Sequence, residues 1–310
     1  MNQDKNTIYR SSVTAWLYLL PTIFVLAVFI FYPALRTFAM AFYRQNFYLG
    51  THQFIGWENF HNLFNGPFAP GFIQTCIQTV IFSVLCVSLT LMISMILSVL
   101  ANHKIRGAKI YRMLLIWPFA LSPAVAGTIF AYIYNPEVGI INTTLRFLFN
   151  VQPGWLTNPI LAFVVAVFAA VWKNLGFNIV FYLAALQNIP KDSIEASKID
   201  GANELQTFVH VIFPLLTPTS FFLLFTNITY SLFDSFAIID VLTRGGPMGQ
   251  SPIGNVGITT TLMYKIFLDG FGGSANMGFA AAETIILMII VAVFTLLQFG
   301  ILGKKVNYDF

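Results

Sequence analysis

Three ionisable side chains lie inside long apolar runs of this sequence, and they are its most chemically capable residues. Lys173 interrupts the run VWKNLGFN, and Asp234 and Glu283 lie in later runs. A charge among apolar residues is costly to bury, so such residues usually pair with one another or line a polar path. The same runs hold uncharged side chains that can form hydrogen bonds, namely Asn178, Asn227 and Tyr230.

These residues support two interpretations. In the first, Lys173 attracts an anionic solute, and the path of that solute is lined by Lys173, Asn178, Asn227, Tyr230 and Asp234. In the second, Lys173 pairs with an acid such as Asp234 and only holds two helices together. Glu283 could also lie near a membrane surface, where its charge costs little.

A second chemical feature is the polar stretch EASKIDGANELQTFVHVIFPLLTP at residues 195–218. Four of its first ten residues are charged, although only 9% of the whole chain is charged. The four are Glu195, Lys198, Asp200 and Glu204. A compact polar segment between apolar runs indicates a surface that faces water or a soluble protein.

The residue order in this stretch predicts two short helices joined by a turn. Pro190 cannot continue the preceding helix, and Asp192 with Glu195 forms the pattern of a capping box. Asp200-Gly201 is a strong turn signal. A second helix is then expected from about Ala202 to Ile212. Its apolar face is expected to hold Leu205, Phe208, Val209 and Ile212, with Pro214 and Pro218 marking the return to the membrane.

The sequence gives little support to enzyme chemistry. Its four histidines do not cluster, and Cys76 and Cys86 lie in one apolar run without metal-ligand spacing. The chain has no Gly-x-x-x-x-Gly-Lys-Ser/Thr loop of the kind that cradles ATP phosphates. We therefore predict no catalytic residue, no metal site and no cofactor.

Long apolar helices must position these polar residues. The chain has 310 residues, of which 57% are hydrophobic, and its mean hydropathy is +0.76. A helix crosses the hydrocarbon core of a bilayer in about 20 residues. The long, unalternating apolar runs predict an all-α integral membrane protein and exclude a porin-like barrel. Six spans are expected, at about 13–35, 72–100, 111–133, 159–187, 212–240 and 276–302.

The six spans predict a single transmembrane domain over residues 1–310, with its core at about 72–302. The segment ITTTLMYKIFLDG at 258–270 is too short and too polar at its end for a further span. We expect it to form a helix at the outer interface.

The distribution of Lys and Arg predicts that both termini face the cytoplasm. With the N-terminus inside, ten basic residues lie on the inner side and five on the outer side. Short loops rich in Lys and Arg stay in the cytoplasm, so residues 192–212 are expected there as well. The basic residues are spread over the ends of the spans, so nucleic acid is not expected as a partner.

The polar stretch resembles the EAA loop of ATP-binding-cassette (ABC) importer permeases in its order of residues. The matching positions are Glu195-Ala196-Ser197, Asp200-Gly201-Ala202, Phe208, Ile212, Pro214 and Pro218, with Ser197 where the family usually has a second Ala. The segments ALSPAVAGTIFAYIYNPEVGIIN and FFLLFTNITYSLFDSFAIIDVLTRGGP extend the resemblance to the permeases of the maltose-type carbohydrate uptake family. The segment AALQNIPKDSIEASKIDGA is most similar to the branch of that family that carries sn-glycerol 3-phosphate.

The resemblance implies a type I, MetI-like importer permease in which residues 192–212 form a cytoplasmic coupling loop. Glu195 would make the main polar contact with an ATPase, and Gly201 would form the bend of the loop. Ala196 and Ala202 would permit close approach, and Phe208 would help to anchor the loop on its own spans. The complete coupling set is Glu195, Ala196, Asp200, Gly201, Ala202, Phe208 and Pro214.

The resemblance also implies the partners and the location of the chain. It implies a second six-span permease, two ATP-hydrolysing subunits, an extracytoplasmic substrate-binding protein and surrounding lipid in a bacterial inner membrane. The implied substrate is sn-glycerol 3-phosphate or a related sugar or polyol. Another mono- or oligosaccharide stays open as an alternative, because sister permeases share most of these segments.

Two other classes of membrane protein fit the sequence less well. An embedded enzyme would need acids, histidines or metal ligands gathered at one membrane face, and these residues are dispersed along the chain. A secondary transporter usually has internal repeats, and none is evident in the sequence.

Overall fold

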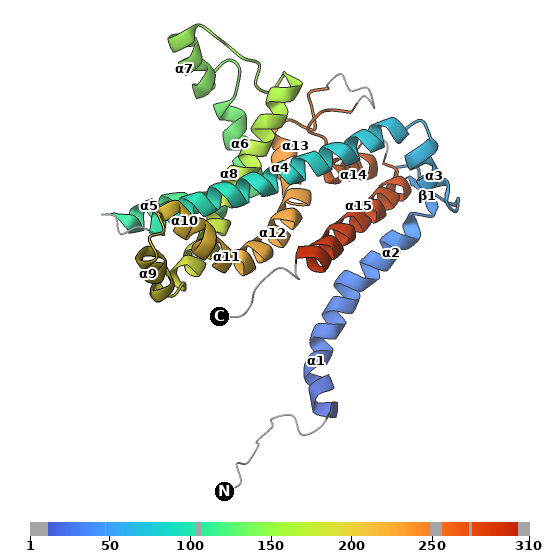
Figure 1. Cartoon of the computed structure of the whole chain (residues 1–310). Coiled ribbons are helices and arrows are strands. Elements are labelled where there is room, and N and C mark those ends of the chain that lie inside the picture. The colour runs from blue at the N-terminus through green and yellow to red at the C-terminus, as the bar shows by residue number, and fades with distance from the viewer. Residues whose placement is uncertain (1–11, 47, 103–106, 249–255, 273–274, 303–310) are drawn as a thin grey trace.

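Helices form almost all of the regular structure in the computed structural model (Figure 1). The model describes residues 12–46, 48–102, 107–248, 256–272 and 275–302. Within these ranges, five helical segments are long and apolar enough to cross a membrane, and a bent pair of helices provides a sixth. The predicted all-α membrane fold with about six spans is therefore confirmed.

The first span, α1 (Ser12–Leu26), continues through a π-helical turn into α2 (Tyr32–Met40). It extends away from the other helices (Figure 1), and no part of its most apolar window is buried within the chain. The second span is α4 (Ala69–Asn102), and the fourth is α8 (Pro159–Gln187), whose bounds match the prediction.

The third span is not the continuous helix that the sequence predicted. It consists of α5 (Ala108–Ile116) with the 3₁₀ turn η2 (Trp117–Ala120), followed by α6 (Pro123–Ile133), and the two parts meet at a bend of 104°. The break lies at Leu121 and Ser122, directly before Pro123. Proline lacks a backbone N–H and favours extended backbone in the residue before it, and Ser122 is extended, with ψ at 151°.

The fifth span differs from its predicted bounds, and the sixth nearly matches them. The fifth begins at α12 (Thr217–Leu232) and continues in α13 (Ser235–Leu242), so it starts later than predicted. The residues before it form the π-helix η3 (Phe208–Ile212) and the short α11 (Phe213–Leu215). The sixth span is α15 (Met277–Leu297), which ends in the π-helix η4 (Gln298–Leu302).

Short elements lie between the spans. An antiparallel hairpin that the sequence did not predict joins β1 (Tyr43–Asn46) to β2 (Thr51–Phe54), with Tyr43 paired to Phe54. It is followed by α3 (Glu58–Asn65), and α7 (Ile140–Phe149) lies between the third and fourth spans. The helix expected at 258–270 is present as α14 (Leu262–Phe271), which packs on α15.

The largest core lies where α8 packs against α4, α6 and α13. Small side chains let these helices approach closely, as they do in membrane proteins generally. Ala162, Ala166, Ala169 and Ala170 are all buried along α8. The core therefore fixes α8, which carries Lys173, against the helices on either side.

Gly176 tests this close packing. A Cβ atom at Gly176 of α8 would meet the backbone carbonyl of Ile116 at the end of α5. We expect Gly176→Val to force these helices apart and to cost about 1–3 kcal/mol, the usual effect of overpacking. The measurement is the thermal stability of the purified complex, followed by fluorescence-detected size-exclusion chromatography.

Gly300→Ala provides the matched control, because no atom lies within 4 Å of a Cβ built at Gly300. If the Gly176→Val complex melts at the same temperature as the Gly300→Ala control, this would contradict the contact between α8 and α5.

Candidate functional site

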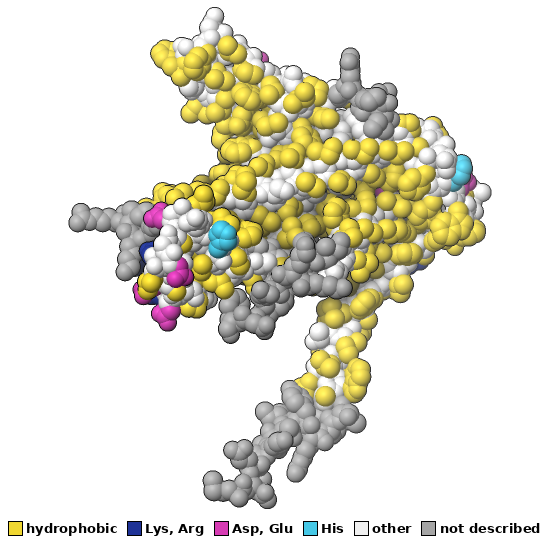
Figure 2. Space-filling view, in the orientation of Figure 1, with side chains coloured by type: hydrophobic (Ala, Val, Ile, Leu, Met, Phe, Trp, Pro, Cys, Tyr) yellow, Lys and Arg dark blue, Asp and Glu magenta, His cyan; other side chains and the backbone are white. Residues whose placement is uncertain are grey.

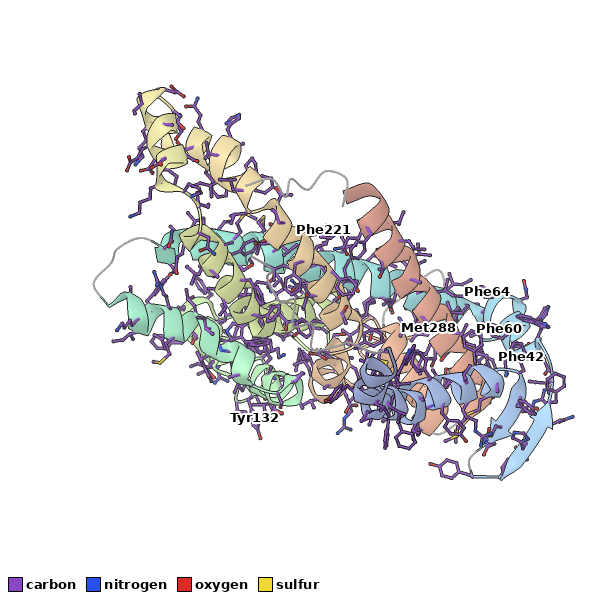
Figure 3. All side chains as sticks on the ribbon, turned by 90° about the horizontal axis from the view of Figure 1, so that it is seen from below. Phe42, Phe60, Phe64, Tyr132, Phe221 and Met288 are labelled. Atoms are coloured by element: carbon purple, nitrogen blue, oxygen red, sulfur yellow. The ribbon has the colours of Figure 1, made fainter. Side chains whose placement is uncertain are left out.

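The polar stretch forms a helical hairpin that projects from one end of the bundle. Its first helix is α9 (Lys191–Ile199) and its second is α10 (Glu204–Thr207), which leads directly into η3. Figure 2 shows acidic side chains gathered over this end, whereas most of the face in view is hydrophobic. Figure 3 shows the hairpin beyond the ends of its neighbours, at the opposite end from Phe42, Phe60 and Phe64.

Local hydrogen bonds hold the two hairpin helices together. The Ser197 hydroxyl lies 3.1 Å from Oγ1 of Thr207 and donates to the Ile194 carbonyl over 2.8 Å. Ser197 is where the sequence departs from the family pattern, and its hydroxyl makes a link between the helices that an alanine could not make.

The turn between the helices depends on Gly201. Its φ is +81°, in the left-handed region that glycine adopts without strain. Asn203 then caps α10 in a capping box: its side chain accepts from the Gln206 N–H, and the Gln206 side chain accepts from the Asn203 N–H, both over 2.9 Å.

One local prediction about the hairpin was wrong. Asp192 does not cap α9, because Pro190 is the N-cap residue and Asp192 lies in the first turn. An acid there still interacts favourably with the helix dipole. The expected apolar face is only partly covered by this chain, since Leu205 is 71% exposed and Val209 is 47% exposed. Ile212 does pack inward, against the core cluster around Tyr182 and Leu216.

The predicted coupling residues all lie on or beside this hairpin. Glu195, Ala196, Asp200, Gly201 and Pro214 are exposed, and Ala202 and Phe208 are half-buried. A shallow hollow of about 400 Å³ opens between the two helices. It is lined by residues that include Asp200, Gly201, Ala202 and His210. The exposed set gives a soluble partner both charge and apolar surface to contact.

The structure brings together three of the five in-span residues predicted to line a path, namely Lys173, Tyr230 and Asp234. The Lys173 Nζ lies 4.0 Å from Oδ2 of Asp234, so the ion pair raised as an alternative is present. Two aromatic rings also face the ammonium, with ring centroids at 5.1 Å for Phe119 and 5.7 Å for Tyr230. Such rings attract a cation through their negative faces. The Lys173 side chain is 7% exposed, whereas that of Asp234 is 42% exposed.

Asn178 and Asn227 form a separate pair deeper in the chain. Each amide donates to the side-chain oxygen of the other, over 3.1 Å and 2.6 Å, and both residues are buried. Asn178 also donates to the Asn174 carbonyl, and Asn227 to the Leu223 carbonyl. The two amides join α8 to α12, and their predicted place along a solute path stays a prediction.

Sequence reasoning missed two features of these sites. Phe119 lies in η2 beside Lys173, and no pattern marked it because the third span was taken as unbroken. The second feature is the contact of Lys265 on α14 with Asp269 at 2.5 Å and with the buried Glu283 of α15 at 3.1 Å. Lys265 and Asp269 lie four residues apart on α14, a spacing that could have indicated this pair. The contact with Glu283 joins two helices and left no local pattern in the sequence.

This charged cluster anchors α14 to the last span. Burial lowers the pKa of Lys265, but the nearby carboxylates of Glu283 and Asp269 outweigh burial and raise it above its ordinary value. Lys265 therefore stays protonated and neutralises part of a charge that would otherwise be costly to bury.

Residues 71–308 match the model of the family described as binding-protein-dependent transport system inner membrane component. The chain belongs to this family. The predicted resemblance to importer permeases is confirmed, and the chain is a membrane transport permease. The match begins within α4 and includes the hairpin, the pair of Lys173 and Asp234, and the cluster of Lys265 and Glu283.

Relatives extend the similarity to nearly the whole chain. The sn-glycerol-3-phosphate transport system permease protein UgpA of Pectobacterium atrosepticum is 36% identical over 306 residues, covering 97% of this chain and 98% of its own length. The proteins of the same name from Brucella abortus and Rhizobium meliloti are each 37% identical, with similar coverage.

Solved structures support the same fold. A chain in the crystal structure of a bacterial ABC transporter that imports the acidic polysaccharide alginate aligns with a TM-score of 0.80 and 22% identity. The alignment covers 95% of this chain and 96% of the other. A chain of an alginate transporter in complex with a pentasaccharide-bound periplasmic protein gives a TM-score of 0.79. The MetI-like importer fold is thus shared.

The buried amide pair generates a prediction about stability. Asn227→Leu leaves Oδ1 of Asn178 without its donor, and an unsatisfied buried polar group costs about 1–3 kcal/mol. Replacing both residues by Leu removes the unsatisfied group, so we expect the double variant to melt closer to the wild type than Asn227→Leu does. Thermal unfolding of the purified complex measures this, and a double variant as unstable as the two single losses combined would contradict it.

Proposed function

We propose that this chain is one of two membrane permeases of an ATP-driven importer for sn-glycerol 3-phosphate or a related sugar or polyol. The observation that carries the proposal is the 36–37% identity, over almost the full length, to permeases named for sn-glycerol 3-phosphate transport. The ammonium of Lys173 lies within a span, beside the half-exposed carboxylate of Asp234 and the ring of Phe119. A positive charge at this place supports an anionic substrate.

Two ATP-hydrolysing subunits are proposed as partners of the hairpin. Glu195 and Asp200 supply charge, and Ile199 and Leu205, which are 86% and 71% exposed, supply apolar anchors. A hairpin with linked helices and a capped turn can transmit a push, whereas a flexible loop would absorb it. Residues 192–212 would thus form the coupling loop of a single transmembrane permease domain.

A second six-span permease and the surrounding lipid are proposed to cover the remaining apolar surface. The span from α1 to α2 is unburied and apolar around its circumference, so it requires lipid or another membrane helix as a neighbour. Asp234 and Tyr230 are also only partly covered by this chain. We place the solute path at this face, completed by the second permease and supplied by an extracytoplasmic binding protein.

We further propose that the hairpin and both termini face the cytoplasm of a bacterial cell. Among the residues assigned to the inner side, Lys109, Arg112, Lys191 and Lys198 belong to α5 and α9. The Arg112 guanidinium donates to the Ala101 carbonyl near the end of α4. Lys5, Arg10, Lys104, Arg106, Lys304 and Lys305 lie outside the described residues, so for them the assignment rests on the sequence.

The coupling role is tested with Glu195→Lys and Gly201→Asp. The first reverses the charge offered to the ATPase, and the second places a side chain at φ +81°, where it is strained. We expect both variants to assemble but to lose most substrate-stimulated ATP hydrolysis in proteoliposomes. Glu137→Lys, a charge reversal at an exposed position before α7, is the control and should keep wild-type hydrolysis. Normal uptake by either hairpin variant would contradict the assignment of residues 192–212 as the coupling loop.

The substrate is tested by uptake in proteoliposomes that contain the complete complex and its binding protein. We expect ATP-dependent accumulation of labelled glycerol 3-phosphate, which unlabelled glycerol 3-phosphate suppresses and neutral mono- and oligosaccharides do not. Accumulation of a neutral sugar in place of glycerol 3-phosphate would refute this substrate and favour the alternative of a sugar permease.

A further inference from the structure

The ammonium of Lys173 is held in place without being saturated by hydrogen bonds. An ammonium has three N–H donors, yet no hydrogen bond from Nζ is found among the described residues. Its nearest charged neighbour is Asp234, at 4.0 Å, which is too far for a direct hydrogen bond. The rings of Phe119 and Tyr230 attract the charge but accept none of its three protons in the ordinary geometry.

The aromatic residues around Lys173 are themselves fixed. Phe177 contacts both Phe119 and Tyr230, with ring centroids 5.2 Å and 5.6 Å apart. Because Phe177 and Lys173 lie one turn apart on α8, the rings and the ammonium form one assembly. Lys173 thus has little freedom to move toward Asp234.

Asp234 has more freedom than its partner. It lies between the end of α12 at Leu232 and the start of α13 at Ser235, and its side chain does not cap α13. Within the described chain its carboxylate has no hydrogen bond, and it is 42% exposed. The pair therefore combines a fixed, buried cation with a loosely held carboxylate at an interruption of the span.

We propose that Asp234 is a displaceable counter-ion of Lys173, and that the phosphate of the substrate takes its place during transport. The inference rests on the proposed function, which supplies an anionic substrate. A phosphate monoester carries more negative charge at neutral pH than a carboxylate. Its three terminal oxygens can accept hydrogen bonds from the Lys173 N–H groups, to which Asp234 makes no hydrogen bond. Asp234 keeps the buried lysine charge-balanced when the site is empty.

This exchange makes Asp234 a specificity-determining residue. An anion gains the full interaction with Lys173 only when it displaces the carboxylate, whereas a neutral polyol leaves the existing pair intact. Removing the carboxylate should therefore strengthen the binding of the anion and leave the binding of a neutral analogue unchanged. A merely structural ion pair gives the opposite result, because its loss would leave a buried charge uncompensated and disorder the site.

The test is equilibrium binding to the complete complex in lipid nanodiscs without the binding protein, with glycerol 3-phosphate and glycerol as probes. We expect Asp234→Asn to bind glycerol 3-phosphate about two- to fivefold more tightly, the range set by a half-exposed ion pair. Asp234→Glu keeps the counter-ion and should bind like the wild type. Asp240→Asn, a half-buried acid on the same helix α13, is the matched control and should also be unchanged.

Lys173→Met should lose binding of glycerol 3-phosphate by at least about tenfold, a loss equivalent to 1.4 kcal/mol or more. The double variant Lys173→Met/Asp234→Asn removes both charges, so it should assemble like the wild type and still fail to bind. Its normal assembly shows that the loss reflects the missing ammonium and not a damaged fold.

An Asp234→Asn complex that binds glycerol 3-phosphate no more tightly than the wild type, while the wild type imports it, would overturn the exchange alone. A wild-type complex that imports a neutral sugar and neither imports nor binds glycerol 3-phosphate would refute the proposed function and the exchange together.

Discussion

An almost unbroken helical run joins the exposed hairpin to the polar cluster inside the span, and the rest of the account depends on it. The run begins with α10 at Glu204 and ends with α12 at Leu232. The run includes the π-helix η3 and two prolines, Pro214 and Pro218. At Leu216, between α11 and α12, backbone hydrogen bonds continue, because Leu216 donates to the Ile212 carbonyl and accepts from the Ser220 N–H. At 1.5 Å per residue, such a run is about 43 Å long. If the hairpin couples to an ATPase as proposed, a push on it would reach Asn227 and Tyr230 along this run.

Two of the polar pairs that join the helices are close, and the third is not. In hydrocarbon, an unpaired polar group is costly, and Asn178 with Asn227 and Lys265 with Glu283 pair at hydrogen-bonding distance. The pair of Lys173 and Asp234 is longer, has no hydrogen bond among the described residues, and leaves the Asp234 side chain 42% exposed. The close pairs fix the helices, and the loose pair is where we propose that a solute competes.

The sequence predicted the spans well because long apolar runs depend on local composition. It did not predict features that depend on contacts between distant residues or on the local details of a helix break or cap. The third span bends by 104° directly before Pro123, and the sequence could not show whether neighbouring helices would tolerate this proline. Asp192 does not cap α9, because Pro190 is its N-cap residue, and a capping box that the sequence analysis missed lies at Asn203 of α10. Contacts across the fold, such as that of Asn178 with Asn227, leave no trace in a single sequence.

The transmission of movement along this helical run is measured most directly by electron–electron double resonance. Spin labels would be placed on the exposed positions Glu204 of α10 and Phe225 of α12, after Cys76 and Cys86 are replaced. In the complete complex, the account predicts that the distance between these labels stays the same with and without bound nucleotide, because hairpin and span move as one body. A nucleotide-dependent change in that distance would show that the hairpin pivots on its own and would contradict the account.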